Sequence, residues 1–378
     1  MSNSTLQKDV TASDLETLPD ALPSPPSSRP RAFITGITGQ DGSYLATLLL
    51  SKGYAVHGLI RRSSTAPEGS NLENLREIRH HPDLTLHKGD ICDPHCIISI
   101  LVEIQPIREI YHLAAQSHVT SSFEIPEVTV QVNVLGTLNV LQAVRVMGMR
   151  GKVRVYNATT SEIFGGVNEA QDPLNEMSLF SPRSPYAISK LSAYWLARNF
   201  RDAYGLFVVN GILFNHESAR RSIRFVTKRI ASGAARYKLG IADAKHPLTL
   251  AGIDMARDFG HAEDYVRGMW LMLQQDEPRD LVLATGVKTT VRDFVEMAFA
   301  RVGVVIRWQG TGPDLKGLDV SNGETVVEID RKLFRPSETE CLIGDSRVAR
   351  EILGWEPLRS IEGLIAEMVD SELARLSK

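Results

Sequence analysis

The chain has 378 residues, of which 43% are hydrophobic and 23% are charged, so it has the composition of a globular protein with room for two domains or one large α/β unit with an appendage. The formal net charge of −3 gives no overall field that would draw nucleic acid or an anionic membrane, and no apolar run reaches the roughly 18 residues that a membrane span requires. Three cysteines, a low and odd number, argue against a disulfide framework and favour a reducing compartment, so we expect a cytoplasmic protein.

Residues 1–30 are rich in Pro, Ser, Thr and Asp and cannot bury a core, which predicts a disordered tail. Lys8 is the only basic residue before Arg29, whereas a transit peptide would be rich in Arg. This segment also lacks the pattern of a signal peptide.

The hydrophobic pattern that follows alternates between short strands and longer helices. It predicts strands at residues 32–35, 55–60, 84–87, 109–113, 153–156 and 207–213. It predicts helices at residues 43–52, 97–105, 129–147 and 186–204. Such alternation is typical of a Rossmann-type, doubly wound parallel sheet in an α/β protein.

The pattern changes after Asn215, where basic residues become dense. We expect residues 31–215 and 248–283 to form the dinucleotide-binding domain, because residues 249–273 have the pattern of another strand and helix of its core. Residues 216–247 and 284–378 would then form a smaller, substrate-binding domain.

A glycine-rich turn, Gly36-x-x-Gly39-x-x-Gly42, joins the first strand to the first helix. Glycines here permit a tight turn and a close approach of the backbone to a pyrophosphate, which the unpaired N–H groups of the helix start can bind. A turn that serves packing alone is the alternative. The other residues that we expect in this cradle are Ile37, Thr38, Gln40 and Asp41.

The end of the second strand selects the cofactor, because an acidic residue there would hold the ribose hydroxyls of NAD. This chain instead has Arg61, Arg62, Ser63 and Ser64. Paired guanidinium groups suit a 2′-phosphate and favour NADP, although two solvated arginines are the simpler alternative. Asp90, followed by Ile91, ends the third strand, where its carboxylate can accept from the adenine amine. The small residues after the fourth strand allow the backbone to lie near a ribose: Leu113, Ala114, Ala115, Gln116 and Ser117.

Two further clusters carry groups suited to acid–base chemistry. Tyr186 and Lys190 lie four residues apart at the start of a helix and therefore share one face. A lysine ammonium favours the phenolate, so the pair can take a hydroxyl proton while hydride leaves the same carbon. Thr160 and Glu162 follow the fifth strand, where a parallel sheet binds its ligand, and Glu162 can reach an acidic C–H or a leaving hydroxyl. A capped helix start is the alternative for the second cluster.

Cys92, His95 and Cys96 have a spacing that could suggest a metal site. No second pair of ligands has suitable spacing, so a buried helix face is the better interpretation and we expect no metal.

From about Arg31 to Leu373 the sequence resembles the GDP-mannose 4,6-dehydratase family, within the extended short-chain dehydrogenase/reductase group. The most specific stretches are TGQDGSYL from Thr38, FNHES from Phe214 and RDFGHAEDY from Arg257. The resemblance implies an NADP-dependent lyase that acts on GDP-mannose and assembles as a homotetramer or homodimer. It implies catalytic roles for Thr160, Glu162, Tyr186 and Lys190.

The resemblance also implies the ligand contacts of several other residues. His216 and Arg221 match positions that line the NADP site. The positions that match the GDP-sugar site are Ser117, Asn215, Val226, Arg229, Arg257, Arg335 and Glu338, together with Thr160, Glu162 and Tyr186.

The chain departs from the family pattern at a few positions. The family usually has HESPRRG where this chain has HESARRS, with Ala219 and Ser222. Lys228-Arg229 replaces an Arg-Lys pair, and Val128 stands where a tyrosine is expected. Residues 65–69 lack the family's usual pattern in a loop that helps neighbouring subunits meet. These changes bear on cofactor affinity, assembly and choice of sugar.

Three alternatives remain open. A 4-epimerase of the same fold typically has no glutamate at the position of Glu162. A dTDP-glucose dehydratase typically has aspartate at the position of Ser161. A non-catalytic nucleotide-binding scaffold is supported only by the changes at Val128 and Ala219.

Overall fold

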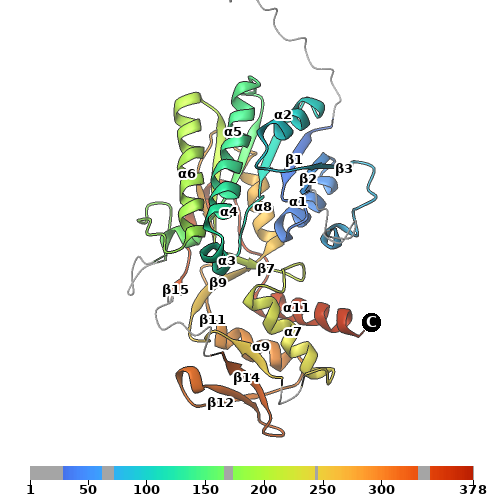
Figure 1. Cartoon of the computed structure of the whole chain (residues 1–378), viewed down its shortest axis with the longest axis vertical. Helices are drawn as coiled ribbons and strands as arrows, with labels where there is room; N and C mark the ends of the chain where they lie inside the picture. The colour runs from blue at the N-terminus through green and yellow to red at the C-terminus, as the bar shows by residue number, and fades with distance from the viewer. Residues whose placement is uncertain (1–28, 62–71, 166–172, 243–245, 331–340, 378) are drawn as a thin grey trace, which may run out of the picture.

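In the part of the chain that the structure describes, seven parallel strands form one large sheet with the order β10-β6-β5-β4-β1-β2-β3 (Figure 1). This computed structural model describes residues 29–61, 72–165, 173–242, 246–330 and 341–377. The strands are β1 (Arg31–Thr35), β2 (Ala55–Arg61), β3 (Leu84–Gly89), β4 (Glu109–His112), β5 (Arg154–Thr160), β6 (Phe207–Leu213) and β10 (Leu281–Leu283). The strand order reverses between β1 and β4, which places a ligand crevice at their carboxyl ends. The predicted doubly wound parallel sheet is confirmed.

Helices cover both faces of this sheet, and each buries one apolar stripe against it. One face carries α1 (Gln40–Ser51), α8 (Ala262–Met272) and α10 (Arg347–Leu353). The other carries α2 (Pro94–Glu103), α5 (Gly136–Val146) and α6 (Pro185–Tyr204). Short helical segments complete this part: η2 (Glu73–Leu75), α3 (Val119–Glu124), α4 (Pro126–Val130) and η4 (Ser161–Phe164).

The single helix predicted at residues 129–147 is wrong in one respect. The chain forms α4, then the π-helical turn η3 (Gln131–Leu135), and then α5. The buried Asn133 lies in this wider turn and bonds both the N–H and the carbonyl of Gln116, at 2.8 and 3.1 Å. A hydrophobic repeat carries no signal for such a turn, because the apolar stripe continues through it.

The described residues also form two smaller sheets below the large one (Figure 1). In one, β9 (Ala256–His261) pairs with β7 (Asn215–Glu217), β11 (Lys288–Thr290) and β15 (Cys341–Leu342). The other has the order β12 (Ile306–Gln309), β13 (Lys316–Asp319), β14 (Thr325–Ile329) and β8 (Leu248–Leu250). A separate apolar core joins them to α7 (Val226–Lys238), α9 (Val291–Arg301) and α11 (Ile361–Leu376), with η5 (Gly312–Asp314) at its margin.

The segment at residues 249–273 does not add a strand to the large sheet, contrary to expectation. Its first strand, β8, pairs with β14 because Leu250 is buried in the second core. Its next strand, β9, belongs to the other small sheet, and only α8 packs against the large sheet beside α1. The seventh strand of the large sheet is β10. Within the described residues, no helix has both the length and the apolar character needed to cross a membrane.

Candidate functional site

A cavity of about 300 Å³ lies where the carboxyl ends of the large sheet meet β7, β9 and the start of α7. Its walls come from segments far apart in the sequence. Thirteen residues that the sequence predicts for the site line it: Asp41, Leu113, Ala115, Ser117, Thr160, Glu162, Tyr186, Lys190, Asn215, His216, Arg221, Val226 and Arg257.

The glycine-rich turn forms the cradle that its spacing predicts. Gly36 has φ +77° and accepts a hydrogen bond from the N–H of Gly39 at 3.0 Å, so the chain turns sharply before α1 begins at Gln40. A Cβ on Gly36 would lie 2.9 Å from the backbone nitrogen of Ala114, and one on Gly42 would meet the Gly36 carbonyl. At both positions the space of a side chain is already taken by backbone, so glycine is required for the sharp turn itself. The N–H groups at the start of α1 are then the groups that could bind a pyrophosphate.

His112 supports this cradle from within the sheet and is 3% exposed. Its Nδ1 lies 2.9 Å from the hydroxyl of Thr35, which also accepts from the N–H groups of Leu113 and Ala114. Its Nε2 lies 3.0 Å from the hydroxyl of Thr137, which itself donates to a backbone carbonyl. These bonds require a neutral imidazole that accepts at Nδ1 and donates at Nε2. Burial, reinforced by the charge of Lys190, lowers the pKa of His112 to about 3.

The predicted acid–base groups converge in the cavity. Ser184 caps α6 and Pro185 begins it, which places Tyr186 and Lys190 on one buried face. The Nζ of Lys190 donates to the carbonyl of Ala158 at 2.9 Å. Thr160 ends β5, and its Oγ1 accepts the N–H of Glu162 at 3.2 Å. Glu162 is near enough to affect the pKa of Tyr186, as the sequence interpretation requires.

The electrostatics of Tyr186 correct one expectation. Burial raises the pKa of Tyr186 to about 12, the charge of Glu162 adds to this, and the Thr160 hydrogen bond and the charge of Arg221 only partly oppose it. Burial also lowers the pKa of Lys190 to about 8. The four-residue spacing of tyrosine and lysine therefore does not by itself lower the pKa of the phenol, because both groups are desolvated and the ammonium is held by a backbone carbonyl.

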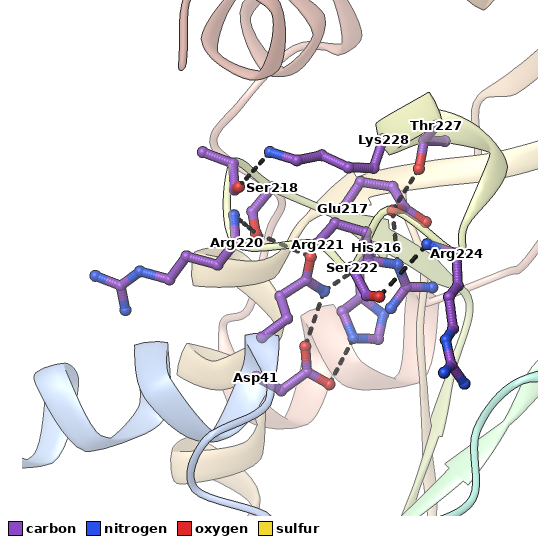
Figure 2. Close-up of polar contacts among 12 residues, drawn as sticks. Asp41, His216, Glu217, Ser218, Arg220, Arg221, Ser222, Arg224, Thr227 and Lys228 are labelled. Atoms are coloured by element: carbon purple, nitrogen blue, oxygen red, sulfur yellow. Dashed lines mark hydrogen bonds and ion pairs between the residues drawn. The ribbon is translucent and has the colours of Figure 1, made fainter. Parts of the chain in front are cut away.

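Asp41 and His216 join the cradle to β7 (Figure 2). The Nε2 of His216 lies 2.9 Å from Oδ2 of Asp41, and the amide of Gln40 donates to both the Asp41 carboxylate and the His216 carbonyl. Burial acts to raise the pKa of Asp41, but the charge and hydrogen bond of His216 lower it to about 2. The sequence assigns both residues to a cofactor site without predicting that they pair.

Glu217 is a cavity residue that sequence reasoning missed. It is 2% exposed, accepts from the hydroxyl of Thr227 at 2.7 Å, and lies 2.9 Å from Nε of Arg221 (Figure 2). The guanidinium of Arg221 also lies 3.5 Å from the centre of the Phe225 ring. The four-residue spacing of Glu217 and Arg221 was an available signal. Asn133, which also bonds Ser189 next to Lys190 at 2.9 Å, had no such signal.

Several predicted residues lie away from this cavity. Arg229 lines a second cavity of about 290 Å³, with Tyr237 and Leu248. Arg61 and Asp90 are exposed at the ends of β2 and β3, and Val128 is exposed on α4. The other described residues expected at the cofactor that do not line the first cavity are Gly36, Ile37, Thr38, Gly39, Gln40, Ile91, Ala114 and Gln116. The remaining predicted site residues lie outside the described residues: Arg62, Ser63, Ser64, Arg335 and Glu338.

The described ranges contain no group of three or more His, Cys, Asp or Glu side chains placed to hold an ion. Cys92 and Cys96 are partly buried free thiols near α2.

Comparison with known proteins places the chain among sugar-nucleotide enzymes. A family model described as GDP-mannose 4,6 dehydratase matches residues 33–368. The chain is 48% identical to the GDP-mannose 4,6-dehydratase of Sinorhizobium fredii (strain HH103) over 352 residues, which cover 93% of this chain and 98% of that relative. It is 47% identical to the GDP-mannose 4,6 dehydratase of Homo sapiens over 348 residues, 91% of this chain and 92% of the human protein.

Solved structures share the fold. RMD from Pseudomonas aeruginosa, complexed with NADPH, aligns with a TM-score of 0.71 and 24% identity over 92% of this chain and all of that chain. DesIV, a dTDP-glucose 4,6-dehydratase from Streptomyces venezuelae with NAD and TYD bound, aligns with a TM-score of 0.73 and 24% identity over 92% of this chain and 98% of that chain.

Proposed function

Because the chain belongs to the GDP-mannose 4,6-dehydratase family, we propose that it converts GDP-D-mannose to GDP-4-dehydro-6-deoxy-D-mannose and water, as an NADP-dependent hydro-lyase. The observation that carries this proposal is the arrangement of Thr160, Glu162, Tyr186 and Lys190 around one cavity. A hydroxyl-binding residue, a carboxylate, a phenol and an amine are the groups that oxidation followed by elimination requires.

The cofactor proposed for this site is NADP. The glycines let the backbone turn sharply into α1, whose first N–H groups can bind a pyrophosphate, and the exposed Arg61 at the end of β2 can pair with a 2′-phosphate. Bound NADP would accept a hydride from the sugar and later return it, so that no net oxidation occurs. We assign the binding of this group to the large-sheet part of the protein and the binding of the sugar nucleotide to the part built on the small sheets.

The first chemical role falls to Tyr186. With Thr160 holding the C4 hydroxyl, Tyr186 takes its proton as the carbon is oxidised. Because burial raises the pKa of Tyr186 to about 12, the phenol must first lose its own proton, and the phenolate so formed is the strong base. We assign the stabilisation of that charge to the Lys190 ammonium, on the same helix face, once the ligands are bound.

Glu162 would act next. A ketone at C4 acidifies the hydrogen at C5, and the Glu162 carboxylate removes it. Water then leaves from C6, with a proton supplied by the Glu162/Thr160 cluster. As hydride returns to C6, C5 would take the proton held by Tyr186, which restores the phenolate. Loss of the C6 hydroxyl is difficult without the neighbouring carbonyl, so oxidation must come first. A 4-epimerase would have no use for a carboxylate here, and a binding scaffold would need none of the four groups.

The sugar nucleotide can extend from the first cavity along α7. Asn215, Val226 and Arg257 line the first cavity, and Arg229, one helical turn after Val226, lines the second. We therefore assign the hexose to the first cavity and the nucleotide end to the direction of the second, where arginine can pair with phosphate.

Mass spectrometry of the reaction with GDP-mannose tests the proposal directly. We expect a product lighter by one water whose 4-keto group absorbs in alkali. Glu162→Gln should abolish turnover while NADP still binds, because the carboxamide cannot take the C5 proton. A protein that binds NADP and GDP-mannose but forms no product, with these four residues intact, would refute the dehydratase assignment.

Assembly is a second part of the proposal. We infer a homo-oligomer, a dimer or tetramer, because exposed apolar side chains gather on neighbouring helices α3, α4 and α6: Phe123, Ile125, Val128, Val130, Ile188 and Trp195. Light scattering should give a multiple of the chain mass, and Trp195→Glu should lower it. The matched control Val305→Glu, at a 66% exposed apolar residue before β12, should leave the mass unchanged. With three free cysteines and no disulfide in the described residues, a cytoplasmic location remains our proposal.

A further inference from the structure

We propose that His216 serves to neutralise Asp41, a carboxylate built into the phosphate cradle, and that this ion pair allows the cradle to accept a dinucleotide. This inference rests on the proposed NADP-binding function. Asp41 lies in the first turn of α1, where a pyrophosphate is expected and where a second negative charge would repel it.

The hydrogen bonds of His216 define its charge. Nδ1 lies 2.7 Å from the carbonyl of Phe214, which can only accept, so Nδ1 must carry a proton. Nε2 lies 2.9 Å from the Asp41 carboxylate, which also accepts. Both ring nitrogens therefore donate, and the ring is an imidazolium. Burial acts against that charge, but Asp41 outweighs it and raises the pKa of His216.

The groups that face this ring from the other elements do not replace Asp41. Tyr265 of α8 stacks on it at 4.4 Å between ring centres, and the nearby Arg221 guanidinium acts to lower the pKa of His216. Asp41 is thus the group that keeps His216 charged, and His216 is the group that compensates Asp41.

The pair is held in register by two neighbours, Gln40 and Ser218. Gln40 is 8% exposed and donates to Asp41 at 3.0 Å and to the His216 carbonyl at 2.9 Å. The hydroxyl of Ser218 donates to Gln40 at 2.9 Å. These contacts fix the carboxylate toward the imidazolium (Figure 2).

An uncompensated Asp41 would also act on the reaction. Its charge already raises the pKa of both Tyr186 and Lys190. Removal of His216 would therefore disturb two things at once: the affinity of the cradle for phosphate, and the pH at which the Tyr186 proton moves.

A double-mutant cycle tests the inference by calorimetric measurement of the NADP dissociation constant from pH 6 to 8. His216→Gln should weaken binding about tenfold or more, because a buried carboxylate is left beside the phosphates. The double variant Asp41→Asn/His216→Gln should recover most of this loss. The matched control is Arg201→Gln, which breaks another largely buried ion pair, Arg201–Asp280 at 2.8 Å, outside the cavity lining. It should leave NADP affinity unchanged.

The outcomes are separable. Equal weakening in His216→Gln and the double variant would mean that His216 contacts the cofactor itself, and unchanged affinity in His216→Gln would mean that Asp41 does not repel it; either result overturns the inference. Equal weakening in Arg201→Gln would assign the effect to packing and also overturn the inference.

A measurement without the cofactor separates this inference from the proposed function. NMR titration of His216 should show a pKa above the ordinary value in the wild type and a clear fall of that pKa in Asp41→Asn. If NADP fails to bind the wild type, the proposed function fails, whereas this titration still reports whether the pair exists. An unshifted His216 would overturn the pair itself.

Discussion

Acid should weaken the fold through His112, the histidine beneath the phosphate cradle. Its neutral ring accepts from Thr35 and donates to Thr137. A proton on Nδ1 would face the hydroxyl proton of Thr35, so that hydrogen bond would be lost. Burial lowers the pKa of His112 in the folded protein to about 3. In the unfolded chain the pKa returns to about 6.5. The unfolded state therefore binds a proton first as the pH falls, and stability is lost from about pH 6.5 down toward the folded pKa of about 3.

The size of this loss follows from the two pKa values. At pH 8 neither state binds the proton, and the contribution is close to zero. At pH 5 the unfolded histidine is almost fully protonated and the folded one is not, which lowers the free energy of unfolding by about 2 kcal/mol. This figure changes little if the folded pKa lies one unit higher, because it would still be below pH 5.

Urea unfolding at pH 8 and pH 5, at one protein concentration, measures this loss against His112→Gln, whose amide can still donate to Thr137. Other groups, such as His57, whose pKa burial lowers to about 4, titrate in both proteins and cancel in the comparison. The wild type should lose about 2 kcal/mol more than the variant over this interval. Equal losses would refute the neutral His112 deduced from its hydrogen bonds.

Two substitutions probe other parts of the structure. Gly42→Ala places a methyl group against the Gly36 carbonyl, so it should cost about 1–3 kcal/mol and weaken NADP binding, measured by thermal unfolding with and without NADP; an unchanged response to NADP would contradict the cradle. Lys228→Met removes a 2.7 Å partner of the fully buried Glu372 and should cost about 3 kcal/mol in urea unfolding. The control Arg375→Gln removes its more exposed partner and should cost less than about 1 kcal/mol; equal costs would contradict the ranking by burial.

The parts of the site that the sequence predicts are those with local signals. Strand, glycine turn and helix occur in order around Gly36, and the spacing of Tyr186 and Lys190 places both on one helix face. Thr160 ends a central strand, so the topology alone brings it to the cavity. When a motif lies at the end of a predicted strand or the start of a predicted helix, the position of its side chains follows from chain order and the geometry of a parallel sheet.

The missed features depend on pairings across the chain. Leu250 belongs to the second core because its strand, β8, pairs with β14. No local sequence pattern predicts this pairing. Asn133 inserts a π-helical turn to reach Gln116, although the apolar repeat around it is that of an ordinary helix. The pKa of Tyr186 depends on burial by the whole site and not on the lysine four residues later.

The cradle and the substrate side of the cavity act as one unit, and α11 secures it. The loop after β7 carries Arg221 and Ala219. The carbonyl of Ala219 accepts from Lys228 at 2.7 Å, and its backbone helps to lower the pKa of Glu367 of α11. Lys228 in turn pairs with Glu372 of the same helix. Since the loop continues from β7, whose His216 pairs with Asp41 of the cradle, a shift of α11 would move phosphate-binding and sugar-binding groups together. Changes near the carboxyl end of the chain should therefore affect both ligands even though α11 contributes no residue to the described lining of the cavity.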